Sequence, residues 1–246
     1  MGEAFLITSG KGGVGKTTFA AHIGAALVRR GKKVLLIDAN FGLRNLDIAL
    51  GLSSEIVYDI YDVTQGLCTV QQAIVAHAQY AQLHMIAAPQ GVQKKVNAEK
   101  LKQFVQMIKE EYDFVFLDGA AGVGSAFCAG AMACDKAIIV TTATLYSLRD
   151  GEQASIGLEH CGVKDFCMVV NRVDPKLMKK KGAINVDDLI DGVRVRLLGI
   201  VLEDKQLSRD MALEKPAFLD YYVKANTCFY NIAARLLGET VPIMRL

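Results

Sequence analysis

The most informative segment of this chain is Gly10-Lys11-Gly12-Gly13-Val14-Gly15-Lys16-Thr17-Thr18. It contains the G-x-x-x-x-G-K-[ST] pattern of a P-loop, in which backbone N–H groups converge on phosphate oxygens. We expect Lys16 to reach the β- and γ-phosphates of a nucleotide and the Thr17 hydroxyl to bind Mg²⁺. All the residues of this segment are therefore predicted to contribute to a nucleotide site.

The residues on either side of the loop favour the same function. Phe5, Leu6 and Ile7 predict a short buried strand before it, and the apolar spacing of residues 19–27 predicts a helix after it. The phosphates would then lie at the positive N-terminus of that helix. The alternative, a glycine-rich turn that binds nothing, is disfavoured by this context.

Lys11 places a second positive charge inside the loop, where an ordinary P-loop needs none. A lysine at this position can answer phosphate charge that Lys16 does not reach, including charge in a neighbouring subunit. The alternative is a solvated loop lysine without a role in binding.

Length, composition and charge exclude several classes of protein. The chain has 246 residues, 52% of them hydrophobic and 22% charged, which is typical of a globular protein and not of a disordered one. Residues 126–145 form the most apolar stretch, but Asp135 and Lys136 interrupt it, so we predict no transmembrane helix. The N-terminus shows no secretory signal, which favours a cytoplasmic protein. The net charge of +2 gives no reason to expect a nucleic-acid partner.

The cysteines do not follow the pattern of a metal or cluster site. No two of them form a C-x-x-C pair, and no histidine has the spacing typical of zinc ligands. We interpret them as reduced, mostly buried thiols in a reducing cytoplasm. They are Cys68, Cys128, Cys134, Cys161, Cys167 and Cys228.

Apolar runs alternate with helix-periodic segments along the whole chain. Strands are predicted at residues 34–37, 83–87, 112–117, 136–140, 166–170 and 197–202, and helices at 56–65, 69–76, 97–111, 185–193 and 221–237, with another ending near residue 160. This alternation predicts an α/β fold with a doubly wound, mostly parallel sheet, helices on both faces and right-handed crossovers. No linker or repeat divides the chain, so residues 1–246 are predicted to form a single P-loop domain.

Acids follow two of the predicted strands, at the edge where open α/β sheets bind ligands. Asp38 could bind Mg²⁺ through water or accept a proton from an attacking water, and the alternative is that it only caps a turn. Asp118 has the Walker-B arrangement, which places a carboxylate beside Mg²⁺. The glycine-rich turn after it, residues 119–124, lets backbone N–H groups approach a γ-phosphate, and we assign Gly122 to this contact.

Asn171 and Arg172 follow the strand at 166–170 and are also assigned to nucleotide binding. The Asn171 side chain carries both a donor and an acceptor, which suits the edge of a base. An asparagine that only forms a turn ahead of Pro175 explains the pattern equally well.

These motifs together resemble the deviant Walker A ATPases, and most of all the branch of that family that positions the bacterial division site. The resemblance runs from the N-terminus to about residue 239. The matching segments are the loop Lys11–Thr18, Gly42-Leu-Arg-Asn-Leu-Asp47, Val57-Tyr-Asp59, Gln65-Gly66, the turn from Asp118 to Gly122, and Leu236-Leu-Gly-Glu239.

The resemblance implies a homodimer that forms with ATP and sandwiches two nucleotides. Lys11 would cross the interface to the partner's phosphates, while Lys16 and Thr17 would hold phosphate and Mg²⁺ in their own subunit. Asp38 would lie in switch I, and Asp118 with Gly122 would form switch II. In the same way, Asn171 would match the adenine-contacting position.

The resemblance also implies protein partners. In this family the ATP dimer binds the inner face of the cell membrane and recruits a MinC-like inhibitor of division, and a MinE-like activator stimulates hydrolysis and releases the dimer. This chain would then be a cytoplasmic ATP hydrolase that acts as a switch. No nucleic-acid partner is implied.

Three departures from the family pattern qualify this expectation. The family usually has a second acid two residues after Asp38, where this chain has Asn40. A carboxamide can orient an attacking water but cannot take its proton, so we predict slow intrinsic hydrolysis. Ala120 replaces a proline of switch II, which is expected to loosen the turn. The family's basic amphipathic membrane helix would follow Leu246, so we expect this chain to reach membrane only through a partner or through such a helix.

Other functions compete with a hydrolytic switch. Asn40 favours a nucleotide-gated adaptor, akin to the flagellar-number regulators, with little intrinsic hydrolysis and no membrane anchor of its own. An iron–sulfur carrier would need paired cysteines, and the spacings offer no C-x-x-C. A DNA-positioning relative would need a basic face, which 28 basic and 26 acidic residues do not supply.

Overall fold

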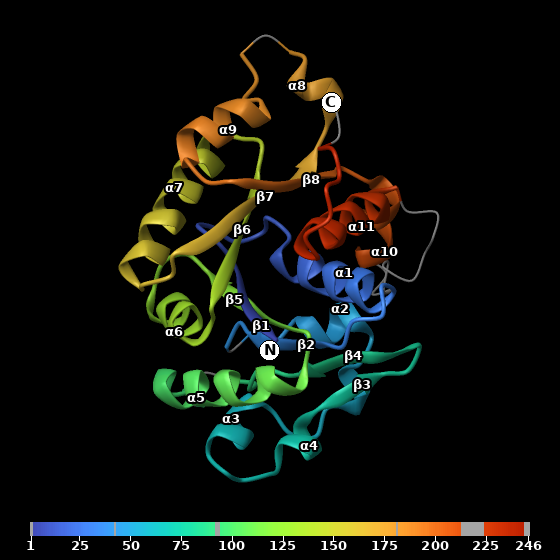
Figure 1. Cartoon of the computed structure of the whole chain (residues 1–246), viewed down its shortest axis with the longest axis vertical. Coiled ribbons are helices and arrows are strands. Elements are labelled where there is room, and N and C mark those ends of the chain that lie inside the picture. Colours follow the sequence, from blue (N-terminus) through green and yellow to red (C-terminus); the bar gives the residue numbers. More distant parts are fainter. Residues whose placement is uncertain (1, 42, 92–93, 181, 213–223, 244–246) are drawn as a thin grey trace.

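The structure is a computed structural model that describes residues 2–41, 43–91, 94–180, 182–212 and 224–243 (Figure 1). An eight-stranded sheet runs through its middle in the order β3-β4-β2-β5-β1-β6-β7-β8. All neighbouring strands are parallel except β3 and β4, which confirms the predicted, mostly parallel α/β fold. The strands are β1 Glu3–Ser9, β2 Val34–Ala39, β3 Val75–His77, β4 Tyr80–Ile86, β5 Phe114–Ala121, β6 Lys136–Thr142, β7 Asp165–Val173 and β8 Leu197–Leu202.

Helices cover both faces of this sheet (Figure 1). They are α1 Lys16–Val28, α2 Leu46–Leu50, α3 Ile60–Thr64, α4 Val70–Ala73, α5 Ala98–Ile108, α6 Ser125–Ala133, α7 Leu145–His160, α8 Pro175–Met178, α9 Val186–Val193, α10 Lys205–Ala212 and α11 Ala225–Leu236. Short 3₁₀ turns occupy Ser53–Glu55 and Lys109–Glu111.

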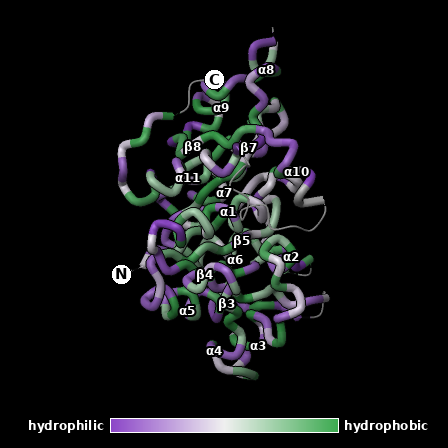
Figure 2. Tube along the Cα trace, turned by 90° about the vertical axis from the view of Figure 1, so that its right-hand side faces the viewer, coloured by the Kyte–Doolittle hydropathy of each residue, from purple (hydrophilic) through white to green (hydrophobic). Residues whose placement is uncertain are grey.

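Successive side chains of β1 pack into different hydrophobic cores because a strand alternates its faces. Phe5 and Ile7 belong to the core that α1 and α11 cover. Ala4 and Leu6 belong to the core under α5, α6 and α7. A continuous apolar run was therefore the right signal for a strand buried on both sides. Figure 2 agrees, because hydrophobic chain gathers along the sheet while the segment around α8 is largely hydrophilic.

The structure corrects the prediction of a helix at residues 69–76. The helix α4 ends at Ala73, and Val75–His77 forms the antiparallel edge strand β3. Val75 pairs with Met85 and Ala76 with His84, so hydrogen bonds and side-chain contacts to β4 outweigh the helical spacing of this short segment.

Two other predicted helices are shorter than expected. The helix predicted at 56–65 begins only at Ile60, because Asp59 caps it and pairs with Ala87 in an isolated parallel bridge. The helix predicted at 221–237 is α11, which begins at Ala225; residues 221–223 lie outside the described part of the chain.

The parallel arrangement brings the ends of separate strands together. Ile7 of β1 pairs with Asp118 of β5, and Asp118 pairs with Asp38 of β2. The loop after β1 and both acids therefore meet at one edge of the sheet. Within the described residues, no helix combines the length and the apolar character that crossing a bilayer requires.

Candidate nucleotide-binding site

The P-loop joins the end of β1 to the start of α1, and its glycines serve two different purposes. Gly13 and Gly15 have φ angles of 78° and 97°, in the left-handed region. A Cβ atom on Gly15 would lie 2.4 Å from the Asn171 Nδ2 atom, and one on Gly10 would lie 2.0 Å from the Asp150 carbonyl oxygen. A Cβ atom on Gly12 or Gly13 would meet nothing within 4 Å. Gly10 and Gly15 thus permit close packing, and the middle of the loop stays open to an approaching anion.

Lys16 is the buried cation of the loop. Its Nζ atom donates to Ser9 Oγ at 2.9 Å, and Ser9 Oγ donates to the Lys11 carbonyl oxygen at 2.6 Å. Burial lowers the Lys16 pKa, and the Asp118 carboxylate opposes this change. A desolvated ammonium group gains strongly from a phosphate anion, so this position suits the role predicted for Lys16.

Thr17 and Asp118 form the part of the site that fits Mg²⁺. The Thr17 hydroxyl donates to Asp118 Oδ2 at 2.6 Å. The other oxygen, Oδ1, is buried and accepts no hydrogen bond from the described residues. Burial and the neighbouring Asp38 raise the pKa of Asp118 to about 7, although Thr17 and Lys16 act in the opposite direction. A divalent cation would occupy the free acceptor and favour the ionised carboxylate, so the donor set fits Mg²⁺.

Asp38 is fully buried and organises the loop that follows β2. Its Oδ1 atom accepts the backbone N–H of Asn40 at 2.9 Å. Its Oδ2 atom accepts the N–H groups of Asn45 and Leu46 at 3.0 and 3.1 Å. Burial raises the Asp38 pKa against these three bonds. Asp38 therefore caps a turn, as the alternative interpretation held. It also lies beside Asp118, and its role toward Mg²⁺ or the attacking water stays a prediction.

Asn40 and Lys11 lie at the rim of the site. The Asn40 carbonyl oxygen accepts the backbone N–H of Leu43 at 3.2 Å, which keeps the residue at the start of the loop. The Lys11 Nζ atom lies 3.9 Å from the Asp150 carboxylate on α7, and both side chains are about one-third exposed. Lys11 is therefore partly exposed, whereas Lys16 is buried.

The turn after Asp118 is bonded to the end of β1. The Gly122 N–H group donates to the Ser9 carbonyl oxygen at 3.0 Å, and Gly122 has a φ of 81°. A Cβ atom on Gly119 would lie 2.9 Å from the Ile7 carbonyl oxygen, so the turn leaves β5 in close contact with β1. Ser9 thus connects the P-loop lysine with this turn.

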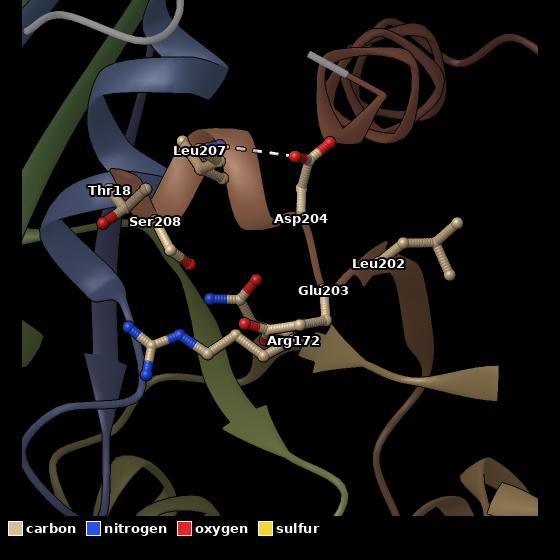
Figure 3. Close-up of a pocket in the computed structure, with 8 residues that line it drawn as sticks. Thr18, Arg172, Leu202, Glu203, Asp204, Leu207 and Ser208 are labelled. Carbon is tan, nitrogen blue, oxygen red and sulfur yellow. Dashed lines mark hydrogen bonds between the residues drawn. The ribbon is translucent and has the colours of Figure 1, made fainter. Parts of the chain in front are cut away.

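Asn171 and Arg172 both hold carbonyl groups of the P-loop. The Asn171 Nδ2 atom donates to the Val14 carbonyl oxygen at 2.8 Å, and an Arg172 Nη atom donates to the Gly13 carbonyl oxygen at 3.1 Å. A pocket of about 140 Å³ lies next to them, between the start of α1 and α10. In Figure 3 Arg172 extends from β7 toward the segment that leads into α1. The pocket is lined by Thr18, Asn171, Arg172, Leu202, Glu203, Asp204, Leu207 and Ser208.

Comparison with known proteins also indicates a nucleotide-binding domain. The model of the CobQ/CobB/MinD/ParA nucleotide-binding domain matches residues 5–217. The chain belongs to this family.

Within the CobQ/CobB/MinD/ParA family, the similarity extends over the full chain. The septum site-determining protein MinD of Bacillus subtilis (strain 168) is 39% identical over 250 residues, covering 100% of this chain and 93% of that protein. MinD in the MinC:MinD cell division protein complex of Aquifex aeolicus has a TM-score of 0.91 and 38% identity, covering 99% of this chain and 98% of that chain. MinD of Pyrococcus horikoshii OT3, complexed with Mg-ADP, has a TM-score of 0.86 and 25% identity, covering 96% of both chains.

The candidate site of this chain includes residues that the sequence interpretation missed. Glu203 and Asp204 directly follow the apolar run of β8, as Asp38 follows the apolar run 34–37, so the same pattern could have identified them. Asp150 lies in the middle of α7, and no local pattern marks it as the neighbour of Lys11. Ser9 is the last residue of β1 and could be recognised only from its contact with Lys16.

Proposed function

We propose that this chain is a MinD-type ATPase that dimerises with ATP and takes part in placing the bacterial division septum. The observation that carries the proposal is the pair of P-loop lysines. Lys16 is buried and donates to Ser9 beside Asp118, whereas Lys11 pairs with Asp150 and its side chain is about one-third exposed. This difference supports a role for Lys16 toward phosphate in its own subunit and a role for Lys11 toward a second subunit. The full-length similarity to septum site-determining proteins supports the cellular role.

In this mechanism the chain's own residues position the nucleotide and the attacking water. Lys16 and the P-loop N–H groups hold the β- and γ-phosphates, and Asn171 and Arg172 keep the loop in shape through its carbonyl groups. Thr17, Asp118 and, through water, Asp38 would hold Mg²⁺, which neutralises phosphate charge when it is bound. Lys11 of a second subunit stabilises the charge that develops at the γ-phosphate. Asn40 orients the water but does not accept its proton.

The partners follow from the same proposal. A relative of this chain is present in a solved complex with MinC, and we propose that the ATP dimer recruits a MinC-like division inhibitor. A MinE-like activator would stimulate hydrolysis and return the dimer to monomers. We place the protein in the cytoplasm and, in the ATP state, at the inner face of the membrane through a partner or a C-terminal helix.

The size of the protein in solution tests this proposal. With Mg-ADP we expect a monomer, and with Mg²⁺ and a non-hydrolysable ATP analogue we expect a dimer. Lys11→Ala should bind the analogue but remain monomeric, and Lys16→Ala should lose nucleotide binding. Lys32→Ala is the matched control, because Lys32 is a partly exposed lysine paired with Asp113 away from the site. A dimer that also forms in ADP, or a Lys11→Ala variant that dimerises normally, would refute the switch.

Asn40 supports a second candidate function. A protein whose switch I offers a carboxamide where its relatives offer an acid can act as a nucleotide-gated adaptor that hydrolyses ATP very slowly. Turnover measured alone and with a stimulating partner separates the two functions. An adaptor should show the ATP-dependent dimer without stimulated turnover.

A further inference from the structure

Two cysteines outside the nucleotide site lie side by side. Cys128 is in the first turn of α6, and Cys161 caps the C-terminal end of α7. Their thiols lie close enough to interact, because the Cys128 thiol is among the causes that raise the pKa of the Cys161 thiol. Both are free and half-buried, so a small reagent can reach them. Among the described residues, no group of three or more His, Cys, Asp or Glu side chains could hold a metal ion, so the chemistry open to this pair is that of two thiols.

The packing of α6 against α7 explains why these thiols meet. Phe127, which precedes Cys128, is buried against Gly157, which lies one turn before Cys161. A Cβ atom on Gly157 would lie only 3.1 Å from the Phe127 ring and 3.4 Å from the Val123 Cγ1 atom. The Cys161 N–H group donates to the Gly157 carbonyl oxygen at 3.0 Å. The helices thus approach closely beside the pair, and neither cysteine sits on a long loop.

We propose that Cys128 and Cys161 are a thiol–disulfide site, at which a low-molecular-weight disulfide converts the pair into a reversible intramolecular disulfide. One thiolate attacks the S–S bond of the reagent, forming a mixed disulfide and releasing one small thiolate. The second cysteine, as its thiolate, attacks the protein sulfur of the mixed disulfide and releases the other small thiolate. The pair gives up two protons and two electrons, and the reagent is reduced to two thiols.

This crosslink would restrain the turn that follows Asp118. The Cys128 N–H group donates to the carbonyl oxygen of Gly124, the residue that caps α6, at 3.1 Å. Gly122, two residues earlier, donates to Ser9 beside the P-loop. Tying the first turn of α6 to the end of α7 therefore limits the movement of switch II when phosphate binds. This consequence rests on the proposed function, whereas formation of the disulfide does not.

The environment makes the pair slow to react at neutral pH. Burial and the neighbouring Cys128 thiol raise the pKa of the Cys161 thiol to about 11. Because the thiolate is the reactive form, attack by Cys161 is slow at neutral pH and accelerates about tenfold per pH unit below that pKa. Formation of the disulfide is therefore slow at neutral pH and faster at higher pH.

Oxidation of the full-length protein tests the proposal. After incubation with oxidised glutathione, peptide mass spectrometry without reduction should find a Cys128–Cys161 crosslink lighter by two hydrogen atoms, and dithiothreitol should remove it. Cys128→Ser and Cys161→Ser should each abolish this crosslink. Cys68→Ser and Cys134→Ser are matched controls at half-buried cysteines and should retain it. Stable glutathione adducts without the crosslink, or crosslinks spread over several cysteines, would overturn the site.

A second measurement tests its effect on the switch. The oxidised protein should lose most of the analogue-dependent dimer that the reduced protein forms, and dithiothreitol or Cys161→Ser should restore it. Equal dimerisation of the crosslinked and reduced proteins would refute the link to switch II. If the reduced wild type fails to dimerise at all, the proposed function is refuted instead, and the crosslink assay alone judges the thiol site.

Discussion

Burial shifts the pKa values of the charged side chains of the site, and a ligand that carries both positive and negative charge would reverse these shifts. Lys16, Asp38 and Asp118 are all buried, and burial shifts the pKa of each toward its neutral form. A magnesium nucleotide supplies a cation for the carboxylates and anions for the lysine. Binding therefore restores the charged forms that burial disfavours.

We expect Asn40 to limit the rate of intrinsic ATP hydrolysis. Asn40→Asp would give switch I a carboxylate that can accept a proton from water, so intrinsic ATP turnover should rise by about tenfold or more. A phosphate-release assay under single-turnover conditions measures this rate. Asn97→Asp, at the exposed N-cap of α5 away from the site, is the control and should leave turnover unchanged. Unaltered turnover in Asn40→Asp would mean that a different group limits the reaction.

His22 makes stability depend on pH. Burial in α1 lowers its pKa from 6.5 to about 4, even though the Thr18 carbonyl oxygen accepts a bond from its ring. Between these pH values the unfolded histidine binds a proton and the folded one does not, so the free energy of unfolding falls as the pH falls. The total loss is on the order of 3 kcal/mol at the acid end.

A pair of histidine variants measures this effect. His22→Gln should show a smaller decrease in unfolding free energy than the wild type between pH 6.5 and 4, measured by urea titration at each pH. His160→Gln, at an exposed histidine at the end of α7, should behave like the wild type. Parallel curves for His22→Gln and wild type would contradict the assignment.

Strand β7 acts as a support for the P-loop. Asn171 is 5% exposed, and its Nδ2 atom donates to the Val14 carbonyl oxygen, so its side chain supports the loop backbone. Contact with a base stays a prediction. The sequence predicted base contact or turn formation for Asn171. The structure adds a third role, support of the P-loop backbone, which depends on a contact between residues 157 positions apart.

Asn171→Ala should weaken nucleotide binding, because the P-loop backbone loses a support. Losing one buried hydrogen bond costs about 1 kcal/mol, so affinity for both ATP and GTP should fall by up to about tenfold, measured by calorimetry. Arg172→Ala removes a solvent-exposed bond to Gly13 and should cost less. If ATP affinity falls and GTP affinity does not, Asn171 contacts the base directly.

The molecule as a whole should be stabilised by its nucleotide. At a concentration about 100-fold above Kd, a ligand specific to the folded state adds about 2.7 kcal/mol. For a chain of this size that corresponds to a rise in Tm of about 5–10 °C. Differential scanning fluorimetry with Mg-ADP should show this rise, and AMP should show much less of it.

Removing Mg²⁺ distinguishes the contribution of the metal to nucleotide binding from that of the phosphate contacts. EDTA should reduce the increase in Tm that ADP causes in the wild type. Without Mg²⁺, no cation occupies the free oxygen of Asp118 or favours the ionised form of this carboxyl group, whose pKa is raised. Asp118→Asn should retain a response to ADP but lose its dependence on Mg²⁺. A wild-type increment that is insensitive to EDTA would show that Asp118 does not serve the metal.

The parts of the protein that could be predicted are those that depend on short-range order. The P-loop, the acid after each apolar run and the alternation of strands and helices lie within a few residues of chain, where glycine geometry and side-chain periodicity suffice. The parallel sheet, with the loop, Asp38 and Asp118 at one edge, follows from this alternation and is observed.

Contacts between distant residues could not be predicted in this way. Asp150 beside Lys11, Asn171 under Val14 and the Cys128–Cys161 pair each join separate elements. Strand β3 likewise exists because β4 lies next to it and pairs with it, and isolated residues 75–77 carry no such preference. Periodicity specifies which face of an element is buried, but the packing of the sheet and its helices determines which side chains meet, because that depends on the spacing and register of elements far apart in the chain.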